Sequence, residues 1–416
     1  MELQAAQGPE VVIRTILGLV ALLALSYLGG HPLVRRLERR LRIAQLVTAG
    51  FPFVALGIVM GLPSVGILSD SVLEVLSPLL SFGLGWIGFS AGFRLDVREL
   101  DGLPQGTARA VGFATALPFG LIVAAASLLL LASSDWSQLS LKNPAFLRDA
   151  LILGTAGAMT AQQAARLLGD AAREQRSLLR LEELAGMVGL AFIAAYFRPQ
   201  GEAVGWQLPG TAWLFLTVGL GVVLGVLAYM VLLRSTSSAE SILLLLGTVA
   251  FGAGFGASLF LAPMVVCFVA GVFLSNIPGD HRPRLREALR QLERPIYLLF
   301  LVIVGAIWEF GDWRGWVLLP FFVGARLLGK WLAETLIRKT TEIGPSADHW
   351  TVRRAPIGQL STAIVVRARL LFPEAAIPIL ETAVLGGAIL TELLVQTFAR
   401  SRPQPTQESL ALGMEP

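Results

Sequence analysis

Long apolar segments alternate with short polar connections over most of the chain. A transmembrane helix needs roughly 20 mainly apolar residues to cross about 30 Å of hydrocarbon. By this rule the pattern predicts thirteen membrane-spanning helices. They are expected near residues 11–30, 43–61, 71–93, 110–132, 149–168, 181–197, 211–233, 239–257, 261–276, 295–309, 315–337, 355–371 and 375–399. We therefore expect an all-α polytopic membrane protein, with a single transmembrane domain over 1–400 and a short tail at 401–416.

Composition supports a lipid environment. Of the 416 residues, 55% are hydrophobic and 15% are charged, whereas soluble domains carry about 25% charged residues. The formal net charge of +4 comes from arginines in short connections, which favours membrane orientation over nucleic-acid binding. The single cysteine, Cys267, and three dispersed histidines indicate no disulfide and no metal site.

The basic residues follow alternate spans. Five arginines between residues 35 and 42 follow the first span, five between 282 and 294 follow the ninth, and Arg338 and Lys339 follow the eleventh. Because cytoplasmic connections are enriched in Lys and Arg, the N-terminus is predicted outside and the C-terminus in the cytoplasm. A bacterial inner (plasma) membrane is the expected location.

Two stretches of sequence recur at a separation of seven spans. The second span ends in Gly57–Pro63 and the ninth in Gly271–Pro278, while Gly88 precedes Phe93 by five residues as Gly305 precedes Phe310. An odd offset inverts the second unit relative to the first. We expect a first repeat at 44–197, linking helices at 198–260 and an inverted second repeat at 261–399, preceded by an extra N-terminal helix and basic loop at 1–43.

The stretch from Pro263 to Phe310 resembles the cation:proton antiporters. It contains Gly271-Val-Phe-Leu-Ser-Asn276, then the basic connection, then Glu293-Arg-Pro295; the element Arg326-Leu-Leu-Gly-Lys330 follows. The resemblance covers most of residues 44–399. It implies a sodium/proton antiporter-like fold of two inverted five-helix repeats, in which two helices are broken near the middle of the bilayer and cross.

The matching broken segments are 154–160 and 356–362, which are rich in Gly, Pro and hydroxyl residues. The expected crossover residues are Gly157, Thr160, Gly358, Ser361 and Thr362. Unwound backbone is tolerated at membrane depth where it lines a cavity. Ordinary kinked helices also contain Thr and Ser, so an ion site and a plain kink are both compatible with these residues.

Arg326 and Lys330 lie one helical turn apart in the eleventh span and so share a face. Charge in the bilayer core costs roughly 2.5–3.5 kcal/mol on insertion scales and is a functional candidate by default. The resemblance implies that Lys330 pairs with the ion-binding carboxylate and takes part in proton exchange. The alternative is that Lys330 extends toward the cytoplasmic face.

The sixth span departs from the family, whose active members carry an acidic pair in mid-membrane. With a gap in the alignment, Glu182 and Glu183 take its place; without one, the pair falls between Gly186 and Leu190, where no acid stands. A span at 181–197 puts Glu182 about 9 Å from its middle, toward the cytoplasm. This favours the ungapped alignment.

Two further positions bear on the charge balance. Gln162 follows Thr160 where the family often has Asp-Pro or Ser-Pro, and Glu392 in the thirteenth span is another candidate counter-ion. The full set of ion- or proton-binding candidates is Thr160, Gln162, Glu182, Glu183, Arg326, Lys330 and Glu392.

Three functions compete. The first is exchange of a monovalent cation such as Na⁺ or K⁺ for H⁺ by alternating access. The second is an antiporter-fold protein that has lost cation coupling and acts as a membrane subunit, sensor or anchor for a protein partner. Anion transport is the third. No enzyme motif is present and no cofactor is expected. The resemblance implies a homodimer, with the first, seventh or eighth span at its interface.

Overall fold

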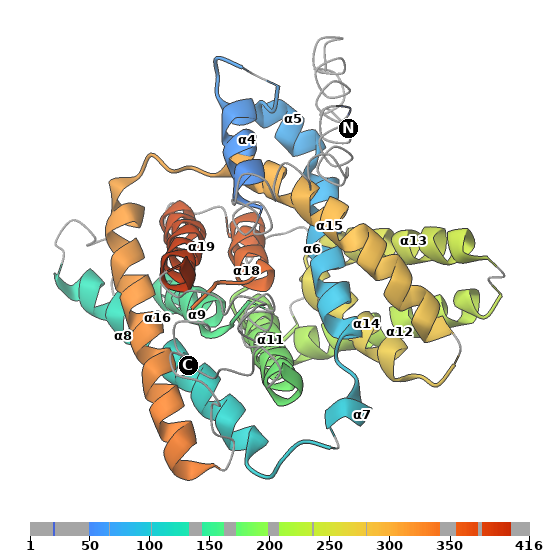
Figure 1. The fold of residues 1–416 in the computed structure, drawn as a ribbon. Coiled ribbons are helices and arrows are strands. Elements are labelled where there is room, and N and C mark those ends of the chain that lie inside the picture. The colour runs from blue at the N-terminus through green and yellow to red at the C-terminus, as the bar shows by residue number, and fades with distance from the viewer. Residues whose placement is uncertain are drawn as a thin grey trace, which may run out of the picture.

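The computed structural model describes Val20 and residues 50–65, 67–100, 102–132, 144–161, 172–198, 208–234, 237–279, 281–341, 355–372 and 377–400. Throughout these ranges the secondary structure is helical, with no strand (Figure 1). The helices are α4 Phe51–Gly61, α5 Asp70–Val75, α6 Ser77–Phe93, α7 Val97–Leu100, α8 Thr107–Ala132, α9 Pro144–Ala158, α11 Ala172–Tyr196, α12 Gly210–Leu232, α13 Ser238–Ser258, α14 Pro263–Asn276, α15 His281–Ile307, α16 Trp313–Thr340, α18 Gln359–Leu371 and α19 Ile377–Arg400.

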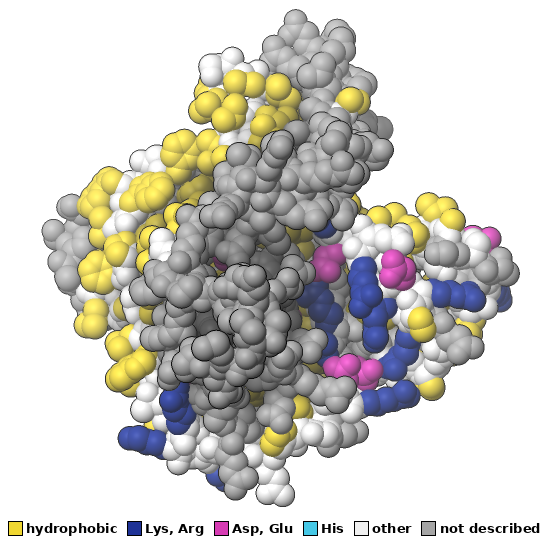
Figure 2. All heavy atoms as spheres, in the orientation of Figure 1, with side chains coloured by type: hydrophobic (Ala, Val, Ile, Leu, Met, Phe, Trp, Pro, Cys, Tyr) yellow, Lys and Arg dark blue, Asp and Glu magenta, His cyan; other side chains and the backbone are white. Residues whose placement is uncertain are grey.

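Five helices in the described ranges are long and apolar enough to cross a membrane on their own: α8, α12, α13, α16 and α19. Other predicted spans appear as shorter or more charged helices. The predicted first span, 11–30, lies outside the described residues except for Val20. Apolar side chains cover the edge of the molecule over α8 and α16, whereas arginines gather over α15 (Figure 2).

Two predicted helix starts were wrong. Helix α11 begins at Ala172, nine residues before the predicted start at 181, and α15 begins at His281, fourteen before 295. The first turns of both helices contain charged residues, so the hydropathy pattern predicted them to be part of the connections between spans. They are helical because one face is buried: Leu285, Ala288 and Leu289 of α15 are all under 10% exposed, with the i, i+3, i+4 spacing of an amphipathic helix.

The helices pack as two bundles. The first, which we call the scaffold bundle, contains α4, α6, α12, α13, α14 and α15; the second, the crossing bundle, contains α8, α9, α11, α16, α18 and α19. Figure 1 shows α12 and α13 at one side of the molecule and α8 and α16 at the other. Each bundle takes helices from both predicted repeats.

Close glycine contacts within the scaffold bundle join helices that the predicted inverted repeat relates to one another. A Cβ added to Gly57 of α4 would lie 2.0 Å from the Val302 carbonyl oxygen of α15, and one added to Gly88 of α6 would lie 2.1 Å from the Met264 carbonyl oxygen of α14. The predicted repeat relates α4 to α14 and α6 to α15. The two helix pairs are therefore counterparts under the predicted repeat, and Gly271 and Gly305, the counterparts of Gly57 and Gly88, make similarly close contacts with Phe89 and Val54. This agrees with a repeated architecture; the exact repeat boundaries stay a prediction.

The crossing of two broken helices is also confirmed. Helix α9 ends at Ala158 and residues 159–161 are not helical, and residues 355–358 before α18 are not helical either. The backbone N–H of Ala161 donates to the Pro356 carbonyl at 3.1 Å, so the two non-helical segments touch. Three of the expected crossover residues are helical: Gly157 lies in the last turn of α9, and Ser361 and Thr362 lie in the first turn of α18.

Candidate ion site at the helix crossing

Arg326 of α16 joins the two broken segments. Its guanidinium is fully buried and donates to the carbonyls of Gly157, Ala355 and Pro356, the last two at 3.2 and 3.1 Å. Gly157 lies at the C-terminal end of α9, where carbonyls lack intrahelical donors and the helix dipole is negative. One side chain thus satisfies backbone groups that both helix breaks release.

Lys330, one turn further along α16, pairs with the buried carboxylate of Glu182. Its Nζ donates to Glu182 Oε2 at 3.0 Å, to the Ala158 carbonyl at 2.7 Å and to the Ala114 carbonyl at 2.9 Å. An ammonium group has three hydrogens, so these three contacts use all of them. The Lys330 and Glu182 side chains are 2% and 0% exposed, which rules out the alternative in which Lys330 extends toward solvent.

The Ala114 carbonyl is available because of a proline. Pro118 lies inside α8 and has no backbone N–H, so the carbonyl four residues earlier lacks its helical partner. Helix α16 comes close at this place: a Cβ on Gly329 would lie 2.4 Å from the Pro118 Cα. Sequence reasoning did not use Pro118, although a proline within an apolar span signals a free carbonyl.

The predicted span put Glu182 near the start of its helix, and this position along the helix was wrong. Because α11 runs from Ala172 to Tyr196, its midpoint is Leu184, two residues from Glu182. The error came from placing the helix start at residue 181. The early turn is buried instead: Leu178 and Leu179 pack in one cluster with Ala110, Ala114 and Ile337.

The positions favoured by the ungapped alignment are filled by packing. Gly186 lies against Met159 in the non-helical segment, where an added Cβ would be 2.0 Å from the sulfur, and Met187 is 1% exposed. Gly189 lies against Thr155 in the same way. Helix α11 therefore approaches the broken helix closely here, and the acid at the crossing comes from Glu182 on the preceding turn.

A cavity of about 670 Å³ between the two bundles reaches the crossing. Its inner residues include Ala161, Glu183, Gln359 and Leu360 from the crossing bundle. Its scaffold wall comes from α6 and α15 and carries Arg94, Arg290, Glu293 and Arg294, together with Ser90 and Tyr297. Glu183 thus faces the cavity while its neighbour Glu182 faces Lys330.

The crossover residues differ in their surroundings. Thr160 and Ser361 are 1% and 0% exposed, and within the described part of the chain their hydroxyl oxygens have no hydrogen-bond partner. The Thr362 hydroxyl donates to the Gly358 carbonyl at 3.5 Å, and a Cβ on Gly358 would lie 3.0 Å from the Ala161 Cα. Gln162 lies outside the described residues.

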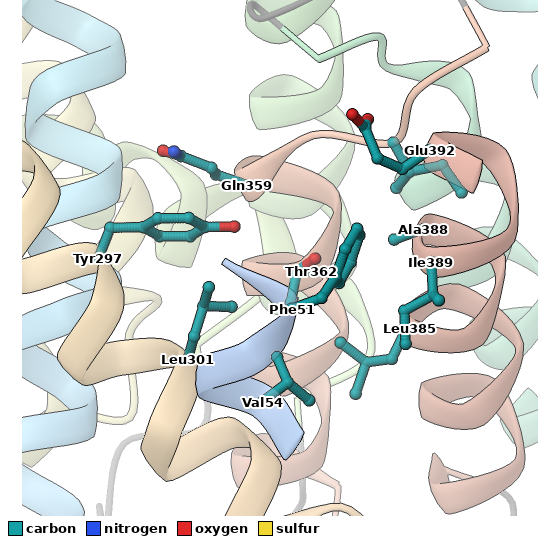
Figure 3. Close-up of a pocket in the computed structure, with 11 residues that line it drawn as sticks. Phe51, Val54, Tyr297, Leu301, Gln359, Thr362, Leu385, Ala388, Ile389 and Glu392 are labelled. Carbon is teal, nitrogen blue, oxygen red and sulfur yellow. The ribbon is translucent and has the colours of Figure 1, made fainter. Parts of the chain in front are cut away.

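Glu392 belongs to a different pocket. It lines a small cavity of about 30 Å³ between the bundles, with Phe51, Tyr297 and Thr362 (Figure 3). Figure 3 shows the Tyr297 ring pointing from α15 toward Phe51 and Thr362, with Glu392, Ala388 and Ile389 on the α19 wall. The carboxylate found on Lys330 is that of Glu182.

Comparisons with known proteins agree with this architecture. Residues 21–401 match the family model described as sodium/hydrogen exchanger, transmembrane. Among solved structures, the chain is similar to the sodium proton antiporter MjNhaP1 from Methanocaldococcus jannaschii, determined at pH 8. The TM-score is 0.64 at 14% identity, over 94% of this chain and 97% of that one. No curated protein sequence matches.

Proposed function

The chain belongs to the sodium/hydrogen exchanger family, and on that premise we propose that it exchanges a monovalent cation for protons by alternating access. The observation that carries the proposal is the buried Glu182–Lys330 pair, which lies at the crossing of the broken helices close to a cavity between the bundles. Apolar helices and family membership make this an integral membrane protein.

The proposed exchange is a competition for one carboxylate. Glu182 can be neutralised by the Lys330 ammonium, by a proton or by an incoming cation, and only one of these fits the pair at a time. A cation that enters through the cavity passes Glu183 and displaces the ammonium from Glu182. Lys330 then releases a proton, which a lysine can do and an arginine cannot.

The backbone supports this competition. The Ala158 and Ala114 carbonyls accept from the Lys330 nitrogen at 2.7 and 2.9 Å, and these two contacts do not depend on Glu182. Lys330 therefore keeps its place while its proton is lost. The buried hydroxyls of Thr160 and Ser361 lie on the two broken segments and provide oxygens of the kind that bind a partly dehydrated cation.

One observation favours the alternative, an antiporter-fold protein without cation coupling. Met159 fills the space beside Gly186 where the family places its acidic pair, so the site has fewer oxygen ligands than the resemblance implies. Such a protein would act as a membrane subunit, sensor or anchor for a protein partner.

Proteoliposomes containing the full chain and an imposed pH gradient separate the two. We expect Na⁺, K⁺ or Li⁺ added outside to dissipate the gradient between about pH 6 and 9. Protein-free liposomes provide the background. A gradient unaffected by all three cations across this range would reject exchange and leave the uncoupled alternative.

We also propose that the protein is a homodimer, with α12 and α13 at the interface. Large apolar side chains on these helices are exposed, among them Phe215 at 76%, Leu243 at 69% and Phe251 at 59%. The orientation with the N-terminus outside and the C-terminus in the cytoplasm of a bacterial inner membrane remains a prediction from the arginine distribution. Native mass spectrometry from mild detergent would give the mass of the assembly, and a monomer would reject the dimer.

A further inference from the structure

A second buried carboxylate lies at the opposite end of the broken helices. Glu381 of α19 is 0% exposed, and its Oε2 accepts from Arg369 of α18 at 2.8 Å. Its other oxygen, Oε1, has no hydrogen-bond partner within the described residues. A buried carboxylate oxygen without a donor is costly and is an available ligand for a cation or a proton.

Arg369 also reaches the surface. Its Nη2 donates at 2.5 Å to Glu309, whose side chain is 63% exposed. Arg369 therefore stands between an exposed carboxylate and a buried one. This order is what a cation arriving from solution would meet: Glu309 first, then the position of the guanidinium, then Glu381.

The same group of residues joins the two bundles. Glu309 directly follows the scaffold helix α15, whereas Arg369 and Glu381 belong to the crossing bundle. Two neighbouring contacts also bridge the bundles: Arg367 of α18 donates to the Leu261 carbonyl at 2.5 Å, and the Trp308 indole N–H donates to the Thr382 hydroxyl at 3.1 Å. We call the three bridging contacts, Arg369–Glu309, Arg367–Leu261 and Trp308–Thr382, the latch.

The two ends of the bundle interface therefore differ. At the Arg94 end the bundles are separated by the cavity of about 670 Å³, and an ion pair there between α11 and the short helix α7, Arg180–Glu99, has a half-exposed carboxylate. At the latch the Glu309 carboxylate is also exposed, at 63%, but Arg367, Trp308 and Thr382 are all under 10% exposed. Exposed ion pairs contribute little to stability, so the buried Arg367–Leu261 and Trp308–Thr382 contacts make the latch end the closed one.

We propose that Glu309 and Glu381 form a cation-entry site at the latch end, held closed by Arg369 until a monovalent cation displaces its guanidinium. This inference rests on the proposed exchange function. It assigns Glu381 to cation entry from one face, separate from the exchange at Glu182. Displacement of Arg369 removes the Arg369–Glu309 contact, one of the three latch contacts, and so weakens the closed end.

Exchange measured from each face tests the entry site. In right-side-out and everted membrane vesicles, Glu381→Gln should raise the half-saturating Na⁺ concentration about tenfold when Na⁺ is on the Glu309 face, and less than about twofold on the other face. The arginine distribution predicts the Glu309 face to be the outer one. Glu309→Gln, on an exposed residue that folding tolerates, should give a smaller rise on the same face only.

Arg314→Gln is the matched control. Arg314 also pairs with a carboxylate, Asp312, in the connection that follows Glu309, but that pair joins neighbouring residues and bridges no bundles. The Arg314→Gln variant should leave the half-saturating Na⁺ concentration unchanged on both faces. An equal rise on both faces in Glu381→Gln, or no rise in either carboxylate variant, would overturn the entry site.

Thiol labelling tests the latch without relying on exchange. The native Cys267 is fully buried, so Thr382→Cys provides the reactive group. Adding Arg369→Gln to Thr382→Cys should speed its reaction with a membrane-impermeant maleimide on the Glu309 face about fivefold or more. Adding Arg314→Gln should not. Equal rates in all three proteins would overturn the latch, even if the wild-type chain carries no exchange and the proposed function itself has failed.

Discussion

Glu182 and Glu381 are both fully buried carboxylates paired with a cation from another helix, yet the cations differ. Glu182 meets a lysine whose other two hydrogens go to backbone carbonyls. Glu381 meets an arginine that it shares with a second carboxylate. A lysine can lose its proton inside a protein, whereas an arginine stays charged. The first pair is therefore suited to proton exchange and the second to an ionic contact that opens and closes.

The backbone around the two carboxylate pairs also differs. The Glu182 pair lies where both helices are broken, close to the cavity between the bundles, and Arg326 satisfies the carbonyls that the breaks release. The Glu381 pair lies in continuous helix at the closed end of the interface. Of these two buried pairs, the one that can release a proton is thus the one beside irregular backbone.

The largest expected effect comes from removing the exchanging carboxylate. Glu182→Gln keeps the shape of the side chain and removes its charge, so an incoming cation no longer finds a carboxylate to bind beside Lys330. Loss of about 3 kcal/mol of interaction corresponds to a fall in exchange rate of about a hundredfold or more. Proteoliposome flux measures it. Glu287→Gln, on the exposed surface of α15, is the control, and a Glu182→Gln protein with wild-type flux would remove Glu182 from the mechanism.

Arg326 should matter for stability more than for charge balance. Arg326→Met leaves the Gly157, Ala355 and Pro356 carbonyls without this donor, and each buried unsatisfied group costs about 1–3 kcal/mol. We expect a loss of about 3 kcal/mol, seen as a lower melting temperature in detergent. Arg338→Met, which removes a pair with Glu334 at the end of α16, should cost far less; similar losses in the two variants would contradict the assigned role.

The repeated glycine contact is the next test. Gly88→Ala places a methyl group 2.1 Å from the Met264 carbonyl oxygen, so α6 and α14 must separate at a cost of about 2 kcal/mol. Gly247→Ala meets nothing within 4 Å and should be neutral or stabilising. Thermal unfolding of both variants compares them, and equal stability would show that the close helix approach is not needed.

The smallest effect is expected at the N-terminus of α16. Asp312 accepts from the Arg314 backbone N–H at 2.9 Å, and its hydrogen bond with the Arg314 side chain lowers the pKa of the carboxyl below its usual value of 3.8. Asp312→Asn should cost about 1 kcal/mol or less. Because the folded pKa is the lower one, the stabilisation is present above the usual pKa and is lost as the pH falls through the folded pKa. A difference between variant and wild type that persists unchanged at pH 2 would contradict this assignment.

Much of the fold could be predicted from the sequence because lipid imposes a simple rule. Long apolar segments identified α12, α13, α16 and α19 within a few residues, and the paired glycine motifs identified the repeat. The same rule misplaced α11 and α15. Their charged first turns are buried against protein or lie at the rim of the molecule, and hydropathy alone does not separate these turns from loops.

The site was only partly predictable. Arg326 and Lys330 were identified because charge within an apolar span is rare, and the broken segments because Gly and Pro cluster there. Glu182 was among the candidates, but the favoured alignment set it aside, because its position along the helix depended on where α11 begins. The contacts of Arg326 and Lys330 with backbone carbonyls depend on where α9 ends, where α18 begins and on Pro118 inside α8, and no residue pattern within α16 reveals them.

Proton release on cation binding tests the central claim most directly. Calorimetric titration of the purified protein with Na⁺ or Li⁺ near pH 8, in two buffers with different ionisation enthalpies, counts the protons that leave per cation bound. We predict about one proton for the wild-type chain and close to none for Lys330→Arg, which keeps the positive charge but cannot release it. Cation binding whose heat is the same in both buffers for the wild-type chain would contradict the exchange at Glu182 and Lys330.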